Sequence, residues 1–111
     1  MSRIPDPAGP VFHALADPTR RRMVGYLAEG ETLTATELGE RLSMSRQAAA
    51  KHLSLLAEAG LVESARTGKE VRYRLTPRPF SDAVTWMADV GGEWDERLAR
   101  LGRFLDGRRR R

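Results

Sequence analysis

The sequence predicts a mainly α-helical domain with a small β-hairpin, an α+β arrangement in the order α-α-α-α-β-β-α. Apolar residues recur at helical spacing in several segments bounded by Gly, Pro or capping residues. Residues 61–75 instead alternate apolar and polar side chains around a polar turn, which is typical of a hairpin. The length of 111 residues suits one domain over residues 1–111.

The N-terminal region predicts an arm followed by two helices. Three prolines and a glycine among residues 1–10 favour an extended arm over a targeting helix. Residues 11–15 have the pattern of a short amphipathic helix. Asp17 and Pro18 indicate the start of a second helix, because an acidic N-cap and a Pro at the first helical position both favour one. Gly30 marks its end.

Residues 34–58 predict two short helices joined by a tight turn. Thr34 and Glu37 have the spacing of a capping box, in which each side chain accepts a hydrogen bond from the other residue's backbone N–H. Ser43–Met44 forms the turn, and Ser45 caps the second helix. The apolar face of that helix, at i, i+4 and i+7, consists of Ala49, Leu53 and Leu56.

The opposite face of the second helix mixes cationic, amide and small side chains. It carries Arg46, Gln47, Ala50, Lys51 and Ser54. Cationic and amide groups can bond to base edges, and small residues let the helix backbone lie close to them. This face is therefore typical of a DNA-reading helix, and the alternative is a helical hairpin whose charges are merely solvated.

Residues 61–75 follow Gly60, which ends the helix, and predict a two-stranded wing. The return strand has an apolar face, Val71, Tyr73 and Leu75, and a cationic face, Arg72 and Arg74. The wing cations that could reach phosphates or an adjacent minor groove are Arg66, Lys69, Arg72 and Arg74. Of these, Arg66, Lys69 and Arg72 are predicted to contact the DNA backbone. An ordinary charged hairpin face is the alternative.

Charge is polarised along the chain, although the net charge is only +4. Residues 43–79 carry seven basic against three acidic residues, and residues 80–107 carry three against six. A basic module beside an acidic helix is expected where one surface meets phosphate and another meets protein. The basic tail, residues 106–111, adds at best sequence-independent phosphate affinity.

Other classes of protein are disfavoured by the composition. The chain has no Cys, which excludes a disulfide framework and a thiolate metal site. It has neither a signal-peptide pattern nor an apolar run near the roughly 18 residues of a membrane span, which predicts a cytoplasmic protein. No Gly-rich phosphate loop and no recognisable spacing of a nucleophile and a His is present, so neither an enzyme nor a cofactor is predicted.

Four motifs carry a resemblance to a known family. They are Phe12-His-Ala-Leu-Ala-Asp-Pro-Thr-Arg-Arg-Arg, Thr34-x-x-Glu-Leu, Ser45-Arg-Gln-x-x-x-Lys-His-Leu and Glu58-Ala-Gly-Leu-Val. In this order and spacing the chain, from residue 11 to about residue 105, resembles the arsenical-resistance-repressor (ArsR/SmtB) family. The resemblance implies a winged helix-turn-helix fold and a homodimeric prokaryotic repressor of transcription.

Metal sensing is not predicted, despite the resemblance. Metal-sensing members of that family use Cys thiolates or a His/Asp/Glu set on the last helix, and this sequence has neither. The only histidines, His13 and His52, are far apart and carry no metal-ligand spacing. His52 is predicted to be a partly buried hydrogen-bonding residue or a phosphate contact, and His13 to pack near the surface.

The last predicted helix, residues 80–105, carries two apolar columns with a seven-residue repeat. Such a stripe predicts a coiled-coil-like dimer seam, and packing onto the domain's own core is the alternative. The predicted dimer interface, which the resemblance also places on this helix, comprises Phe12, Leu15, Phe80, Val84, Met87, Trp94, Leu98, Leu101 and Leu105. Gly91–Gly92 predicts a kink or a close helix crossing, and Trp86 and Trp94 either pack or wall a small-molecule pocket.

These features predict a sequence-specific DNA-binding regulator: a homodimeric repressor or autorepressor of a palindromic operator, with double-stranded DNA and a second copy as partners. Arg46 and Gln47 are the predicted base-reading residues. The whole predicted DNA-binding set is Ser45, Arg46, Gln47, Ala50, Lys51, His52, Arg66, Lys69 and Arg72. The alternatives are a repressor that responds to a small molecule near the C-terminal helix, and a winged-helix protein-interaction module.

Overall fold

The computed structural model describes residues 9–109, apart from the side chains of residues 93, 94, 98 and 105–109. Over these residues the elements are α1 (Gly9–Leu15), α2 (Pro18–Leu27), β1 (Leu33–Thr34), α3 (Ala35–Leu42), α4 (Arg46–Glu58), β2 (Val62–Thr67), β3 (Glu70–Leu75) and α5 (Pro77–Arg109). Most of the predicted arm, residues 1–8, and the end of the basic tail, residues 110–111, lie outside the described residues. The arm prediction was wrong for residues 9 and 10, which begin α1.

The predicted fold class is confirmed: a mainly helical domain carries a small antiparallel sheet, with strand order β1-β3-β2. The observed element order differs from the predicted one by β1, which pairs Leu33 with Tyr73 and Thr34 with Arg72. Two residues are too few to show a period of two, so the sequence pattern did not reveal this strand. β1 pairs with β3 of the wing and ends at Thr34, the residue that caps α3.

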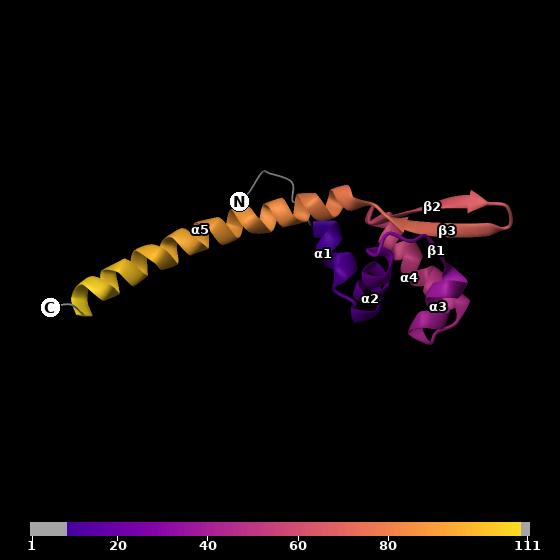
Figure 1. Cartoon of the computed structure of the whole chain (residues 1–111), viewed down its shortest axis with the longest axis horizontal. Coiled ribbons are helices and arrows are strands. Elements are labelled where there is room, and N and C mark those ends of the chain that lie inside the picture. The colour runs from indigo at the N-terminus through magenta and orange to yellow at the C-terminus, as the bar shows by residue number, and fades with distance from the viewer. Residues whose placement is uncertain (1–8, 110–111) are drawn as a thin grey trace.

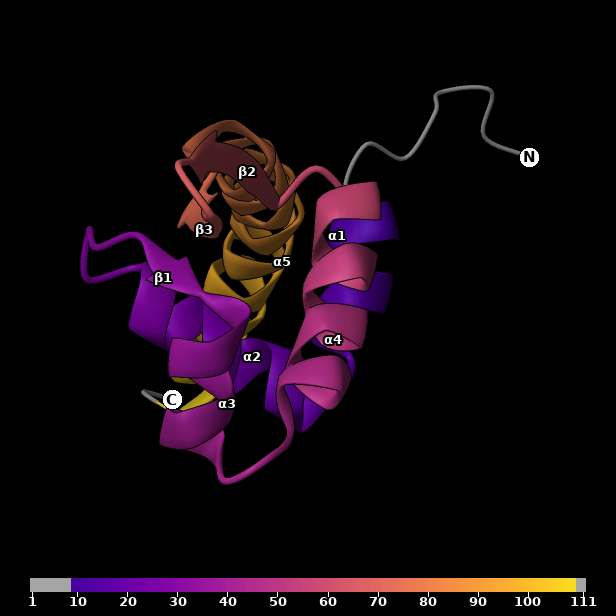
Figure 2. The same ribbon diagram turned by 90° about the vertical axis from the view of Figure 1, so that its right-hand side faces the viewer.

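Helices α1 to α4 all contribute buried side chains to one hydrophobic core. Figure 2 shows α4 beside α3. The largest fully buried side chains are Met23, Leu27, Leu38, Leu53, Leu56, Leu61 and Val11. The predicted inward face of α4 is confirmed, since Ala49, Leu53 and Leu56 are all buried. On α3, Leu38 and Leu42 are buried as well. Each large side chain contributes about 1.5–3 kcal/mol by leaving water. The core therefore holds α4 by one face and leaves the other face free.

Helix α5 begins directly after β3 and projects away from the body of the domain as a single, gently curved helix (Figure 1). It is longer than the predicted 80–105 helix at both ends. The sequence predicts a kink or a close helix crossing at Gly91–Gly92; the helix is uninterrupted there, so the kink is wrong, and the crossing stays a prediction. Among the described residues, no group lies within 4 Å of a Cβ built at either glycine.

The three predicted helix starts are confirmed by their capping bonds. The Asp17 carboxylate accepts the Arg20 N–H at 3.0 Å. Thr34 and Glu37 form the complete capping box, at 3.0 Å and 2.8 Å. The Ser45 hydroxyl accepts the Ala48 N–H at 3.1 Å. Each bond satisfies a backbone donor that has no partner within its helix.

Two of these caps make stability depend on pH. The Arg20 backbone N–H lowers the pKa of Asp17 below its ordinary value of 3.8. The Thr34 backbone N–H, followed by the charge of Arg72, lowers the pKa of Glu37 below 4.5. A carboxyl whose pKa is lower in the folded state stabilises the fold above its unfolded pKa, and this contribution is lost as pH falls through the folded pKa.

We expect the free energy of unfolding to fall as pH drops below about 4.5, and to fall less steeply in Glu37→Gln. Gln at this position completes a capping box but does not titrate. Urea unfolding between pH 6 and pH 3 measures both slopes. Identical slopes for the wild-type chain and Glu37→Gln would contradict the role of this carboxylate.

Candidate nucleic-acid interface

The turn between α3 and α4 is compact and built from backbone contacts. Ser43 adopts a left-handed conformation, with φ of 56°, and the Met44 N–H donates to the Gly39 carbonyl at 2.8 Å. Gly39 is buried, and a Cβ on it would lie 2.7 Å from the Met44 carbonyl oxygen. The absence of a side chain at residue 39 therefore allows α4 to follow α3 closely in the helix-turn-helix.

The face of α4 that points away from the core carries most of the predicted reading residues. Ser45, Arg46, Gln47, Lys51 and Ser54 are exposed, and Ala50 is half-buried. Within the described part of the chain, neither Arg46 nor Lys51 forms an ion pair. These cationic side chains are thus free to meet an external anion.

A groove of about 460 Å³ separates this face from the wing. Its walls come from the start of α3, the start of α4 and the wing: Thr34, Ala35, Thr36, Glu37, Arg46, Ala50, Lys69, Glu70, Val71 and Tyr73. It brings together Arg46 and Lys69, two cations that are 23 residues apart in sequence. Two carboxylates, Glu37 and Glu70, line the same groove, although the sequence pattern indicated neither as part of the interface.

The wing places Arg66 and Lys69 near its tip, where both are exposed. β2 and β3 pair from Val62–Leu75 to Thr67–Glu70. The two-residue turn uses Gly68 with φ of 64°, a conformation that favours Gly. Arg74, by contrast, pairs with Glu63 on the neighbouring strand. The wing tip therefore offers two cations to a partner.

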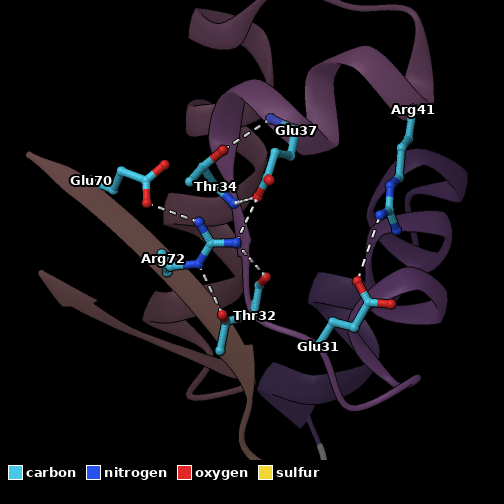
Figure 3. A network of polar contacts seen from close by, with 7 residues as sticks. All are labelled: Glu31, Thr32, Thr34, Glu37, Arg41, Glu70 and Arg72. Carbon is cyan, nitrogen blue, oxygen red and sulfur yellow. Dashed lines mark hydrogen bonds and ion pairs between the residues drawn. The ribbon is translucent and has the colours of Figure 1, made fainter. Parts of the chain in front are cut away.

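Arg72 lies in a different environment from the one predicted for a phosphate contact (Figure 3). Its guanidinium donates to the Thr32 hydroxyl and carbonyl, at 3.0 Å and 3.1 Å. It also forms ion pairs with Glu37 at 3.1 Å and with Glu70 at 3.0 Å. The side chain is only 28% exposed. Arg72 is thus occupied by contacts within the chain.

His52, predicted either to hydrogen-bond or to contact phosphate, is half-buried on the flank of α4. Its Nδ1 faces the Asp17 carboxylate at 3.9 Å, too far for a hydrogen bond. That buried atom has no hydrogen-bond partner among the residues that the structure describes. His52 therefore points toward the start of α2, and His13 is exposed on α1.

Some residues of the predicted dimer interface are exposed on α5. Val84 and Met87 are 58% and 46% exposed, Leu101 is exposed, and the Phe12 ring packs edge-on against Trp86 at 5.7 Å. Leu15 and Phe80 instead pack partly against the domain's own core. The side chains of Trp94, Leu98 and Leu105 lie outside the described residues. A row of apolar side chains on α5 thus faces outward.

Among the described residues, no group of three or more His, Cys, Asp or Glu side chains is placed to hold a metal ion. No helix in that part of the chain has both the length and the apolar character needed to cross a membrane.

Residues 15–65 match a family model described as a helix-turn-helix domain. The transcriptional repressor SdpR of Bacillus subtilis is 31% identical over 88 residues, covering 79% of this chain and 97% of that protein. The arsenic resistance transcriptional regulator ArsR1 of Pseudomonas putida is 37% identical over 99 residues, covering 83% and 77%. The solved structure of an ArsR-like transcriptional regulator from Rhodococcus sp. RHA1 has a TM-score of 0.74 at 40% identity, covering 86% and 89%.

Proposed function

Because the chain belongs to the ArsR family of winged-helix transcriptional regulators, we propose that it is a homodimeric repressor that occupies a palindromic operator. Its relatives are regulators of transcription and not enzymes. The observation that carries the proposal is the exposed face of α4, whose cations and amide lie beside a wing that carries further cations. Its proposed target, chromosomal DNA, makes the cytoplasm the expected compartment.

In the proposed complex, two α4 helices related by a two-fold axis enter successive major grooves about 34 Å apart. Arg46 reads guanine and Gln47 reads adenine, because their side chains match the major-groove edges of these bases. Ser45, Lys51, Arg66 and Lys69 contact the DNA backbone. Ala50 lets the helix approach the bases. His52, whose Nδ1 faces Asp17, supports α4 from the inner side.

The second copy is proposed to pack against the outward apolar face of α5. Val84, Met87 and Leu101 are exposed there, and a large apolar surface on a small domain indicates an interaction site. Phe12 and Trp86 extend this surface onto α1. A two-fold interface uses the same patch on both subunits, so this row of residues on one copy would pack against the same row on the other copy.

We further propose that the repressor does not sense metal through its own ligands. The sequence has no Cys, and its two histidines occupy different surroundings. His52 faces an N-cap carboxylate, whereas His13 lies on the surface of α1. Zinc and nickel sites in proteins bring several Cys, His, Asp or Glu ligands together in one place, and no such group occurs among the described residues. Isothermal titration with zinc is expected to give no saturable heat.

Arg46→Ala tests the reading role of α4. We expect it to weaken binding to the operator by about 1–3 kcal/mol and to relax the choice of base at one position, with little effect on scrambled DNA. Fluorescence anisotropy with operator variants measures both effects. Lys69→Ala is the control, since loss of a phosphate contact weakens both duplexes alike and lowers the salt slope by about one. Equal losses on both duplexes for Arg46→Ala would refute base reading.

A further inference from the structure

Arg72 joins two parts of the interface that are distant in sequence. It lies on β3, opposite Thr34 of β1, and Thr34 is the residue that caps α3. Its guanidinium reaches Thr32, Glu37 and Glu70 at the same time (Figure 3). A planar, forked donor suits this task, because it bonds acceptors on several sides at fixed angles. Arg72 therefore ties the wing strand to the first helix of the helix-turn-helix.

The same contacts change the charge of the groove. Glu37 and Glu70 line it together with Arg46 and Lys69. Without a partner, the two carboxylates would repel the phosphates that these cations attract. Arg72 forms an ion pair with each carboxylate, at 3.1 Å and 3.0 Å. With Arg72 in place, three cations stand against two carboxylates at the groove, so its net charge is positive and attracts phosphate.

We propose that Arg72 is a positioning residue, which holds the wing at its angle to α3 and offsets part of the negative charge of Glu37 and Glu70, and that it does not itself contact phosphate. This inference rests on the proposed function, because it assumes that the groove faces DNA. The geometry supports it in two ways. Nε and both terminal nitrogens already donate to acceptors within the chain, and most of the side chain is covered.

The first test separates an action through the carboxylates from direct contact with DNA. Operator affinity is measured by anisotropy for the wild-type chain, Arg72→Gln, the pair Glu37→Gln with Glu70→Gln, and the triple variant. We expect Arg72→Gln to lose about tenfold in affinity in the wild-type background and less than about threefold once both carboxylates are gone. The same loss in both backgrounds would overturn the proposal, because a phosphate contact does not depend on these acids.

Two more variants sharpen the test. Arg72→Lys keeps the charge, but its ammonium cannot reach all the acceptors at once, so we expect it to lose nearly as much affinity as Arg72→Gln. A wild-type affinity for Arg72→Lys would indicate a simple phosphate contact. Arg74→Gln is the matched control: it removes an equal charge from the same strand, where the partner is Glu63, and is expected to change affinity less than about threefold.

A measurement without DNA keeps this inference separate from the proposed function. Amide hydrogen exchange in the free protein is expected to be faster in β1 and β3 of Arg72→Gln than in Arg74→Gln, with melting curves showing that both remain folded. Unchanged exchange would overturn the positioning role. If the wild-type chain bound operator and scrambled DNA equally, the proposed function would fail, whereas the exchange data would still decide whether Arg72 holds the wing.

Discussion

Met87→Glu is expected to convert the proposed dimer into a monomer and to weaken operator binding at least about a hundredfold. Met87 lies at the middle of the outward apolar face of α5 and is 46% exposed in the single chain. A two-fold interface would bury the new carboxylate twice without a partner, at a cost of several kcal/mol. A monomer also loses the gain in affinity from binding two half-sites at once.

Sedimentation velocity and anisotropy measure the two effects of Met87→Glu. Thr85→Glu is the matched control, because it adds the same charge to an exposed polar position of the same helix. It should remain dimeric and retain operator binding. A Met87→Glu protein that is still dimeric at micromolar concentration would show that α5 does not form the interface through this face.

Gly39→Ala is expected to destabilise the fold by about 1–3 kcal/mol and to impair DNA binding even where the chain is folded. The added Cβ would lie 2.7 Å from the Met44 carbonyl oxygen and 3.3 Å from that of Ser45. Both atoms belong to the backbone, so relief requires α3 and α4 to move apart at their turn. That movement displaces the start of the reading helix.

Gly25→Ala is the same chemical change, but we expect it to stabilise the fold. Gly25 lies within α2, and no group is within 4 Å of a Cβ built on it. Because Ala favours a helix interior more than Gly does, we expect Gly25→Ala to raise stability by up to about 1 kcal/mol. Urea unfolding compares the two variants. A Gly39→Ala protein as stable as the wild type would contradict the tight α3–α4 turn.

The sequence was informative wherever the signal is local. The capping box at Thr34 and Glu37, the Ser45 cap and the 3.6-residue period of α4 depend on residues within one or two turns of each other, and all were confirmed. The alternation of residues 61–75 around a polar turn likewise located the hairpin. In each case, neighbouring residues determine both the element and the face that it buries.

What the sequence could not provide was the identity of distant partners. Alternation placed Arg72 on the cationic face of the wing, but it could not show that Thr32 and Glu37 lie beside that face. The approach of His52 to Asp17 was hidden for the same reason. The low helix propensity of the two glycines of α5 predicted a kink or a close crossing, whereas the helix runs through both without a break.

We propose above that this chain reads a specific DNA sequence through α4. The most direct test is anisotropy of the wild-type protein on DNA from upstream of its own gene and on a scrambled duplex of the same composition, over a salt titration. We expect binding to the upstream DNA to persist near physiological salt with two chains per site, while the scrambled duplex is released. Equal binding to both duplexes that disappears together as salt rises would contradict sequence reading and leave only attraction between charges.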